Sequence, residues 1–377
     1  MNGWTTRVLV AAAGIGLLAT PAAAQFDKIG KGLSVAKKAN DAIYTEAEKQ
    51  QLGAEVSAKI RKKFGVVQDP AVHRYVTLVG AVLARVSAKP DYPWRFIVLD
   101  TDAVNAFAAP GGYIHITKGC LALLANESEL AGVLGHELVH VTEDHTVKAL
   151  SKAGFVDAGA SATGKGNTIT AGLVDQVTNI ALQGFGRGEE LESDKDGLAM
   201  AAKAGYQPNG LSTFLRRLQD RNAGSSEKRG LFASHPQMQE RLEKLAAQEK
   251  KSGASAVTLE ARYKQHIAYK PVPQAAIATV AAGSSGLASG GSSSKKSDTK
   301  AEKPETEEKP KKRGFGLGKI ADSLGGGEKK SGQTVASGGA RGLDPEVDAK
   351  GGPNPGVVSV SVSPGDIETF RKEGKLA

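Results

Sequence analysis

The feature that most constrains this chain is a pair of histidines four residues apart in the segment GHELVH, residues 135–140. The segment has helical periodicity, and residues four apart on a helix lie on one face, so the imidazoles of His136 and His140 can reach the same ion. Glu137 lies close to that face, where a general base for an activated water is needed. A buried helix with two unrelated histidines is the weaker interpretation, because the chain has only seven histidines. The pattern predicts a metal site, which requires a third protein ligand.

Residues 1–24 have the features of a secretory signal peptide. Arg7 supplies a positive charge, residues 8–20 form an apolar run, and Ala22-Ala23-Ala24 provides a cleavage site before Gln25. The run is short for a membrane span, and an uncleaved anchor is the alternative. The chain has a single cysteine, which excludes an intrachain disulfide framework. Export without structural disulfides predicts the periplasm of a Gram-negative bacterium.

The net charge of +9 is concentrated in one part of the chain. Residues 284–343 contain twelve Lys/Arg and seven Asp/Glu, so +5 of the +9 lies there. This segment is rich in Gly, Ser, Lys and Glu and too poor in large apolar residues to form a core, which predicts disorder. The basic balance therefore does not predict nucleic-acid binding.

Composition divides the 377 residues into one folded domain and a long tail. Val358, Val360 and Val362 alternate with serines near the end and predict one late strand. The predicted organisation is a signal peptide at 1–24, an N-terminal lead-in at 25–44, the domain at 45–250, a linker at 251–282, a disordered segment at 283–343 and a C-terminal tail at 344–377.

The domain is predicted to be mostly helical, with a small sheet. Strands are expected at 95–99 and at Tyr113–Thr117, the second after a Pro-Gly-Gly turn, with His115 on the strand surface; the alternative for residues 105–117 is a plain hairpin. Asn126 is expected to cap the helix that carries HExxH, with Glu129 completing a capping box. The expected helices are 41–64, one starting at Asp69-Pro70, one from Asn126 through Val141, 173–184, 209–221 and one opened by Ser234, and a mobile loop is expected at 154–172.

An acidic run supplies candidates for the third ligand. A metzincin would need glycine at 143 and histidine at 146, where this chain has Glu143 and Thr146, so that class is excluded. His145, five residues after His140, is expected well round the helix from the metal face. Glu190 and Asp194 are one helical turn apart: Glu190 can bind the metal, and Asp194 can accept a hydrogen bond from an imidazole ligand. Glu189 and Glu192 compete with Glu190 on spacing alone.

Four segments together carry a resemblance to a known family. They are NAFAAPGG (105–112), GHELVH (135–140), the GRxxExExD pattern (186–194) and Ser234-His235-Pro236, in that order. The chain resembles the HtpX/CAAX-prenyl-protease-type zinc metallopeptidases, and within them the periplasmic BepA-like branch, over roughly residues 45–250. No tetratricopeptide repeats are evident after the domain, in contrast to BepA.

The resemblance implies an α+β, mostly helical gluzincin-type metallopeptidase domain. His136, His140 and Glu190 would bind one Zn2+ per chain, and Glu137 would act as the base. His235 would act either as a latch that binds the metal or as a donor to the oxyanion, for which Arg187 is the competing candidate. The small sheet would align substrate on an edge strand, assigned to Tyr113–Thr117, with Asn105, Gly111, Gly112 and Tyr113 as substrate-binding residues.

The function implied is a secreted zinc-dependent endopeptidase that hydrolyses envelope proteins in periplasmic protein quality control. The alternative is a latent protease that acts as a chaperone-like binding protein in outer-membrane protein assembly. The expected partners are unfolded or misassembled envelope proteins, with peripheral outer-membrane association and without nucleic acid. The sequence leaves the oligomeric state open.

Overall fold

The computed structural model describes residues 44–154, 169–222, 235, 238–252, 257–273 and 356–377. The predicted signal peptide, the predicted disordered segment, and most of the predicted lead-in and of the 154–172 loop lie outside these residues, as do residues 253–256 and 274–282 of the predicted linker. Ser234 and Pro236 also lie outside them, whereas His235 is described.

The first two helices begin and end where the sequence provides caps. Thr45 caps α2 (Glu46–Phe64) with a reciprocal capping box, and Gly65 ends it with a positive φ of 70°. The helix therefore starts later than the predicted residue 41. Asp69 accepts hydrogen bonds from two backbone N–H groups at the start of α3 (Pro70–Val86), as the Asp-Pro step predicts.

The remaining helices surround a small sheet, and the predicted α+β, mostly helical class is confirmed. None of the helices in the described part of the chain is long and apolar enough to cross a membrane. In chain order they are η1 (Pro110–Gly112), α4 (Lys118–Leu123), α5 (Glu127–Thr142), α6 (His145–Lys152), α8 (Ala171–Gln183), α9 (Arg187–Lys203), α10 (Gly210–Asn222), α12 (Met238–Glu249), α13 (Glu260–His266) and α15 (Pro364–Glu373).

The sheet has a different strand order from the one expected. Its three strands are β1 (Arg95–Leu99), β2 (Ala106–Ala109) and β3 (Tyr113–Thr117), in the order β1-β3-β2. The assignment of Tyr113–Thr117 as the edge strand is therefore wrong, because β3 is central: β1 pairs with it in parallel and β2 in antiparallel. The hairpin alternative describes β2 and β3 correctly. Within the described residues, β1 and β2 are the edges of the sheet.

The central position of β3 also explains a second correction. His115, expected on the strand surface, is fully buried, and its Nε2 lies 2.9 Å from the hydroxyl of Ser57 on α2. Burial lowers the pKa of His115 to about 3, so the imidazole is neutral at physiological pH. A strand between two neighbours, with α2 and α5 both packed against it, offers its side chains little solvent.

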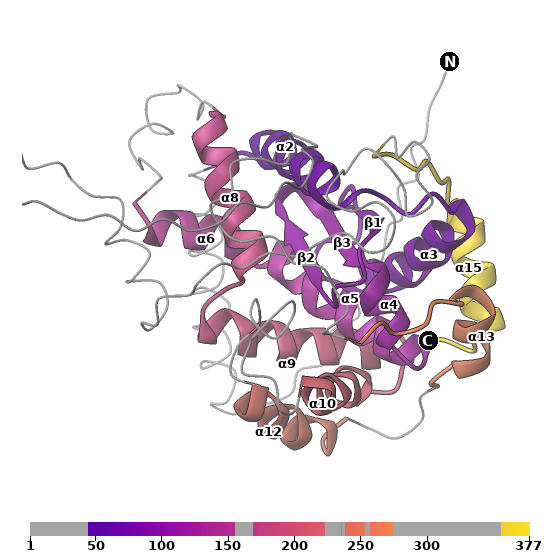
Figure 1. Cartoon of the computed structure of the whole chain (residues 1–377). Coiled ribbons are helices and arrows are strands. Elements are labelled where there is room, and N and C mark those ends of the chain that lie inside the picture. Colours follow the sequence, from indigo (N-terminus) through magenta and orange to yellow (C-terminus); the bar gives the residue numbers. More distant parts are fainter. Residues whose placement is uncertain (1–43, 155–168, 223–234, 236–237, 253–256, 274–355) are drawn as a thin grey trace, which may run out of the picture.

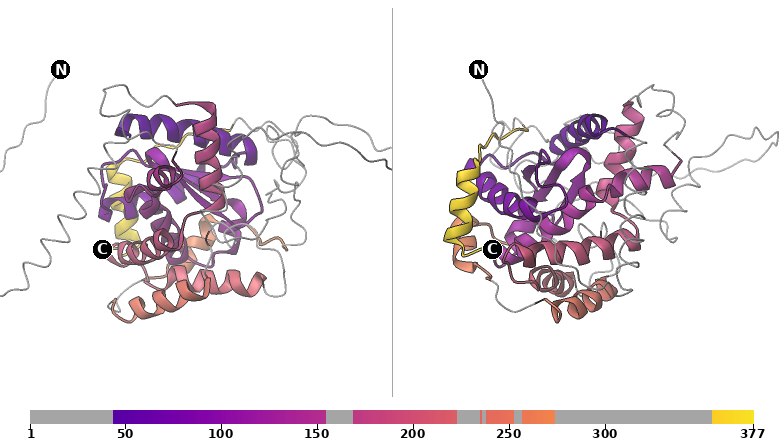
Figure 2. Two further views of the ribbon diagram at one scale, coloured as in Figure 1. Left: turned by 90° about the vertical axis from the view of Figure 1, so that its left-hand side faces the viewer. Right: turned by 180° about the vertical axis from the view of Figure 1, so that it is seen from behind.

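Helix α5 is the central helix of the domain, and all of its residues are buried. It packs between the sheet, which it contacts mainly at β2, and helices α3, α9 and α10 (Figures 1 and 2). The approach of α5 to α9 is close because two glycines face each other: a Cβ on Gly197 would lie 2.8 Å from the backbone N of His136. Gly135, expected to leave room for packing or substrate, contacts Gly197 and so serves packing.

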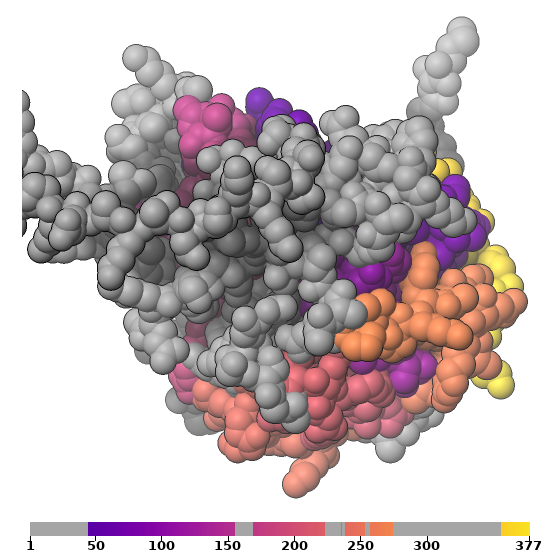
Figure 3. Space-filling view, viewed as in Figure 1, coloured from indigo at the N-terminus to yellow at the C-terminus, as the bar shows by residue number. Residues whose placement is uncertain are grey.

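The C-terminal segment folds back onto the domain. The strand predicted at 358–362 is wrong: this stretch has no strand partner among the described residues, and the helix α15 follows it. Helix α15 lies beside α3 and α13 at one side of the molecule (Figures 1–3). Phe370 of α15 is buried there, with the guanidinium of Arg262 3.8 Å from its ring centroid. The end of the tail is thus part of the domain core.

Candidate metal centre

The helix that carries HExxH is fixed at its first turn. The side chain of Asn126 accepts a hydrogen bond from the backbone N of Glu129 at 3.0 Å, as predicted. In a capping box the carboxylate of Glu129 would accept from the backbone N of Asn126, but here it accepts from the backbone N of Ala125, at 2.8 Å. The same carboxylate pairs with Arg217. These bonds satisfy amide groups that a helix start otherwise leaves unpaired.

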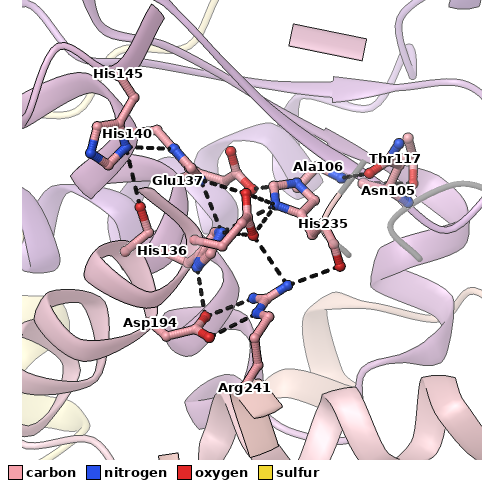
Figure 4. A network of polar contacts seen from close by, with 12 residues as sticks. Asn105, Ala106, Thr117, His136, Glu137, His140, His145, Asp194, His235 and Arg241 are labelled. Carbon is pink, nitrogen blue, oxygen red and sulfur yellow. Dashed lines mark hydrogen bonds and ion pairs between the residues drawn. The ribbon is translucent and has the colours of Figure 1, made fainter. Parts of the chain in front are cut away.

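Four buried side chains meet at one point between α5 and α9. His136 and His140 come from α5, and His235 comes from the segment before α12 (Figure 4). Glu190 comes from α9. One donor atom from each lies within 4.8 Å of all the others. Three imidazoles and one carboxylate in a buried cluster are a donor set that suits Zn2+. The residues present therefore fit the metal that the sequence predicts.

The donor atoms point at a common centre. His140 Nε2 lies 3.0 Å from His136 Nε2, and the two oxygens of Glu190 lie 3.5 and 3.6 Å from these two nitrogens. His235 approaches from the other side, with its Nδ1 3.2 Å from His136 Nε2 and 2.9 Å from Glu190 Oε2. The structure thus brings Glu190, rather than Glu189 or Glu192, to the two histidines of the motif.

The charges around the cluster favour an anionic carboxylate. Burial alone would raise the pKa of Glu190, but His235 and Arg241 outweigh it and hold that pKa well below its ordinary value. Burial would lower the pKa of His136, but Asp194 and Glu190 outweigh it and raise that pKa to about 9. Because a metal binds the unprotonated imidazole, binding at this cluster must release a proton from His136.

Glu137 differs from the other carboxylates of the site. It is 1% exposed, and neither of its oxygens has a hydrogen-bond partner within the described part of the chain. His235 Nε2 lies 3.7 Å from one of these oxygens. Burial raises the pKa of Glu137, which makes the carboxylate a better proton acceptor. A buried carboxylate with free lone pairs beside a set of metal-binding side chains has the properties of a general base.

Asp194 lies beside a histidine ligand, as predicted, and it is paired with Arg241, which the sequence analysis did not single out. Asp194 Oδ1 is 2.9 Å from His136 Nδ1. The buried guanidinium of Arg241 donates to both oxygens of Asp194, at 2.6 and 2.7 Å. A third nitrogen of Arg241 lies 3.2 Å from Glu190 Oε2 and donates to the backbone carbonyl of His235 at 3.2 Å. Arg241 thus links α12 to the acidic residues of α9.

The signal for Arg241 in the sequence was weak. It is one of several charged residues on an amphipathic helix, and only the tertiary arrangement buries it. Its place six residues after His235, on the helix that the Ser-His-Pro step opens, could have marked it as a neighbour of the site. A buried arginine requires acidic partners, and here it has two.

Arg187 lies away from the cluster. Its side chain is 59% exposed and forms a salt bridge with Glu240 on α12. The prediction that Arg187 lies beside the cluster as a donor to the oxyanion is therefore wrong in this structure. Glycine at the N-cap of α9 and an exposed first turn place Arg187 on the outer side of the helix, while Glu190, three residues later, points inward.

The predicted substrate-binding residues lie at the two ends of β2. Asn105 is buried, and its side-chain oxygen accepts a hydrogen bond from the backbone N of Ala106 at 2.9 Å. Gly111 and Gly112 have φ of 73° and 87° and allow α2 and the Pro93 backbone to come close, so the chain itself uses this space. Tyr113 is half-buried under the guanidinium of Arg95. A substrate contact at these residues stays a prediction.

The fold and the donor set define the class of protein. Two histidines and a glutamate between them on one helix, with a second glutamate from a later helix, form the site of an HExxH metallopeptidase domain with a glutamate as the third protein donor, a gluzincin. The comparisons agree with this class. Residues 70–249 match the model of peptidase family M48.

Relatives come from bacteria and from mitochondria. The chain is 27% identical over 210 residues to the beta-barrel assembly-enhancing protease of Escherichia coli (strain K12). The aligned region covers 52% of this chain and 42% of that protein. The same protein of Yersinia pestis is 28% identical over 196 residues, with 49% and 40% covered. The mitochondrial metalloendopeptidase OMA1 of Schizosaccharomyces pombe is 28% identical over 201 residues, with 52% and 59% covered. The match thus spans less than two thirds of each of these relatives.

Proposed function

We propose that this chain is a zinc-dependent endopeptidase that hydrolyses unfolded or misassembled envelope proteins. The observation that carries the proposal is the buried cluster of His136, His140 and Glu190 beside Glu137, whose oxygens have no hydrogen-bond partner among the described residues. The similarity to proteases named for beta-barrel assembly supports the choice of substrate. Proteolysis of an unfolded outer-membrane protein by the purified chain tests it, with a Glu137→Gln variant as the inactive control.

His136, His140 and Glu190 would hold one zinc ion per chain. Bound zinc lowers the pKa of water and polarises a carbonyl oxygen. The role of Asp194 follows from its position at Nδ1 of His136, where a carboxylate keeps the proton on that nitrogen and leaves Nε2 free. Arg241 holds Asp194 and Glu190 in place and offsets the repulsion between these two carboxylates on adjacent turns of α9.

Glu137 would carry the proton during hydrolysis. Its carboxylate accepts a proton from the attacking water and then donates it to the nitrogen of the leaving amine. The raised pKa of this buried side chain suits both steps, since the group must bind the proton and release it again. Burial of the whole cluster keeps bulk water from competing for the same carboxylate.

The structure changes where an extended substrate can lie. A substrate that adds to a sheet needs an unpaired strand edge, and β3 has none because it pairs on both sides. Strand β2 is an edge of the described sheet and packs against α5, the helix of the HExxH motif. We therefore place the substrate along β2, with Asn105 at the start of that strand, in place of the earlier assignment to Tyr113–Thr117.

A second candidate function has an observation of its own. His235 Nδ1 lies within 3.2 Å of both His136 Nε2 and the carboxylate of Glu190, so it can serve as a fourth protein ligand. A closed set of four protein ligands is typical of a structural site, whereas a catalytic site keeps one position for water. The chain would then be a latent protease that binds unfolded outer-membrane proteins in a chaperone-like way until His235 moves.

Replacing His235 by alanine distinguishes its two roles. We expect higher turnover and faster zinc exchange in His235→Ala, because removal of a fourth ligand opens a position for water. Peptide hydrolysis and zinc release to a chelator are the measurements. Lost turnover with zinc retained would instead make His235 a donor to the oxyanion. Unchanged turnover and unchanged zinc release would leave it as a helix-start residue.

The proposed location is the periplasm. The support is the signal-peptide pattern of residues 1–24, which lie outside the described residues, together with the similarity to beta-barrel assembly-enhancing proteases. N-terminal sequencing of the secreted protein tests the location, and Gln25 is the expected first residue. Peripheral association with the outer membrane belongs to the same proposal, and no nucleic-acid partner is proposed.

A further inference from the structure

His145 lies against His140, a member of the donor cluster, because the HExxH helix ends just before it. Helix α5 ends at Thr142 and α6 begins at His145, so the helical spacing that separates His145 from His140 does not apply. Asp144 turns the chain with a positive φ of 53°, and its carboxylate is 3.0 Å from the ammonium of the buried Lys49 on α2. This ion pair holds the turn that brings the fully buried His145 back to His140.

The contacts of His140 define where its proton must be. Its Nε2 faces the donor cluster, 3.0 Å from His136 Nε2 and 3.6 Å from Glu190 Oε1. If that nitrogen binds the metal, the ring carries its hydrogen on Nδ1. His140 Nδ1 lies 2.9 Å from His145 Nδ1, which is therefore the acceptor.

The same reasoning fixes His145. A neutral imidazole that accepts at Nδ1 carries its hydrogen on Nε2. His145 Nε2 lies 3.1 Å from Glu192 Oε2, and the carboxylate accepts this hydrogen. One consistent set of donors and acceptors thus runs from the solvent-accessible Glu192, whose side chain is 42% exposed, through the buried His145 to His140.

The two histidines of the motif are thus supported differently. The carboxylate of Asp194 lies 2.9 Å from Nδ1 of His136, whereas Nδ1 of His140 is linked to the carboxylate of Glu192 through the imidazole of His145. Phe185 stacks on the His140 ring with centroids 4.2 Å apart and restricts its rotation from one side. The hydroxyl of Ser193 is 3.5 Å from His145 Nδ1, farther than His140, so His140 is the better partner of His145.

We propose that His145 is a positioning residue for His140, and that Glu192 orients His145. The three side chains form a carboxylate–imidazole–imidazole chain that holds His140 in the tautomer and ring orientation needed to bind the metal. The proposal rests on the proposed role of His140 as a zinc ligand. The proposal gives a role to Glu192, which the sequence spacing offers as an alternative third ligand. It also gives a role to His145, which the sequence spacing places away from the metal face.

The test measures zinc release from the full chain to an excess of chelator. Loss of an outer partner of a metal ligand weakens metal binding by roughly 10–100-fold, so we expect zinc release from His145→Leu to rise within that range. Glu192→Gln should also release zinc faster, because an amide orients His145 less strongly than a carboxylate. His145→Gln should restore much of the wild-type behaviour, because its amide can accept from His140 and donate to Glu192.

Asp196→Asn is the matched control. Asp196 is also an acidic residue of α9, with a side chain 40% exposed, and it pairs with Lys195 rather than with a histidine. Its zinc release should equal that of wild type. The double variant Glu192→Gln/His145→Leu should release zinc no faster than His145→Leu, since Glu192 acts through His145.

The outcomes separate this proposal from the proposed function. A wild-type chain that binds no zinc would refute the function. Normal zinc binding by wild type, with release from Glu192→Gln and His145→Leu equal to that of Asp196→Asn, would overturn only the positioning role. Additive effects in the double variant would contradict the chain of contacts. If His145→Leu does not fold, the partly exposed Glu192→Gln and the His145→Gln variant still decide the question.

Discussion

Replacing Glu137 by glutamine is expected to reduce peptide hydrolysis by about 10²–10⁴-fold, the usual contribution of a general acid–base group. Glutamine has the shape of glutamate but cannot take up a proton from water. Because Glu137 is not among the four clustered donor residues, the variant should bind zinc as wild type does and keep its fold. The measurements are turnover of an unfolded outer-membrane protein, zinc content and thermal unfolding, all on the same preparation.

The matched control for this prediction is Glu143→Gln. Glu143 is the C-cap residue of the same helix, and its side chain is partly exposed and lies 3.9 Å from Lys148. This substitution makes the same chemical change outside the donor cluster, so turnover should stay near that of wild type. If Glu137→Gln, fully loaded with zinc, also cleaves at the wild-type rate, another group is the base and the assignment is wrong.

The parts of the site that sequence could predict are those within one helix. His136, Glu137 and His140 lie within five residues, and Glu190 and Asp194 share one face of α9, so helical geometry alone relates the members of each set. The structure places the two faces opposite each other. The resemblance added His235, which the structure brings to the same cluster from 45 residues downstream of Glu190.

The parts that sequence could not predict depend on how distant segments pack. The order of the strands is set by which strand reaches β3 from each side, and this is not encoded in the pattern of Tyr113–Thr117 itself. The break at Asp144 has no glycine or proline to mark it, so helical spacing places His145 away from the metal face, whereas the structure brings it to His140. Arg241 is buried only because α12 packs on α9.

The start of α15 carries local sequence signals of a helix. Ser363-Pro364 followed by Asp366 is a capping box with proline at the first helical position, and the structure confirms both features at the start of α15. The alternation of valine and serine just before it predicts a strand instead. The cap residues are the better signal here, because a helix end is fixed by its own neighbouring residues, whereas a strand is stable only when a second strand pairs with it.

Replacing Glu190 by glutamine is expected to weaken zinc binding strongly, because Glu190 is itself one of the four clustered donor residues. Its two oxygens lie 3.5 and 3.6 Å from Nε2 of His136 and of His140, and its anionic charge would bind zinc directly. We expect Glu190→Gln to weaken zinc binding by more than the roughly 10–100-fold typical of an outer partner. Competition with a chelator of known affinity measures this loss, and it should exceed the loss in Glu192→Gln.

Glu189→Gln is the matched control, because the two glutamates are adjacent on α9 but point to different partners. Glu189 pairs with Lys152 of α6, away from the motif histidines, so its replacement should leave zinc affinity unchanged. Thermal unfolding provides a second readout: a ligand at 100 times its Kd stabilises the folded state by about 2.7 kcal/mol. Zinc should therefore raise the Tm of wild type and Glu189→Gln clearly, and that of Glu190→Gln much less. Wild-type affinity in Glu190→Gln, with a loss in Glu189→Gln, would mean that the third ligand has been assigned to the wrong glutamate.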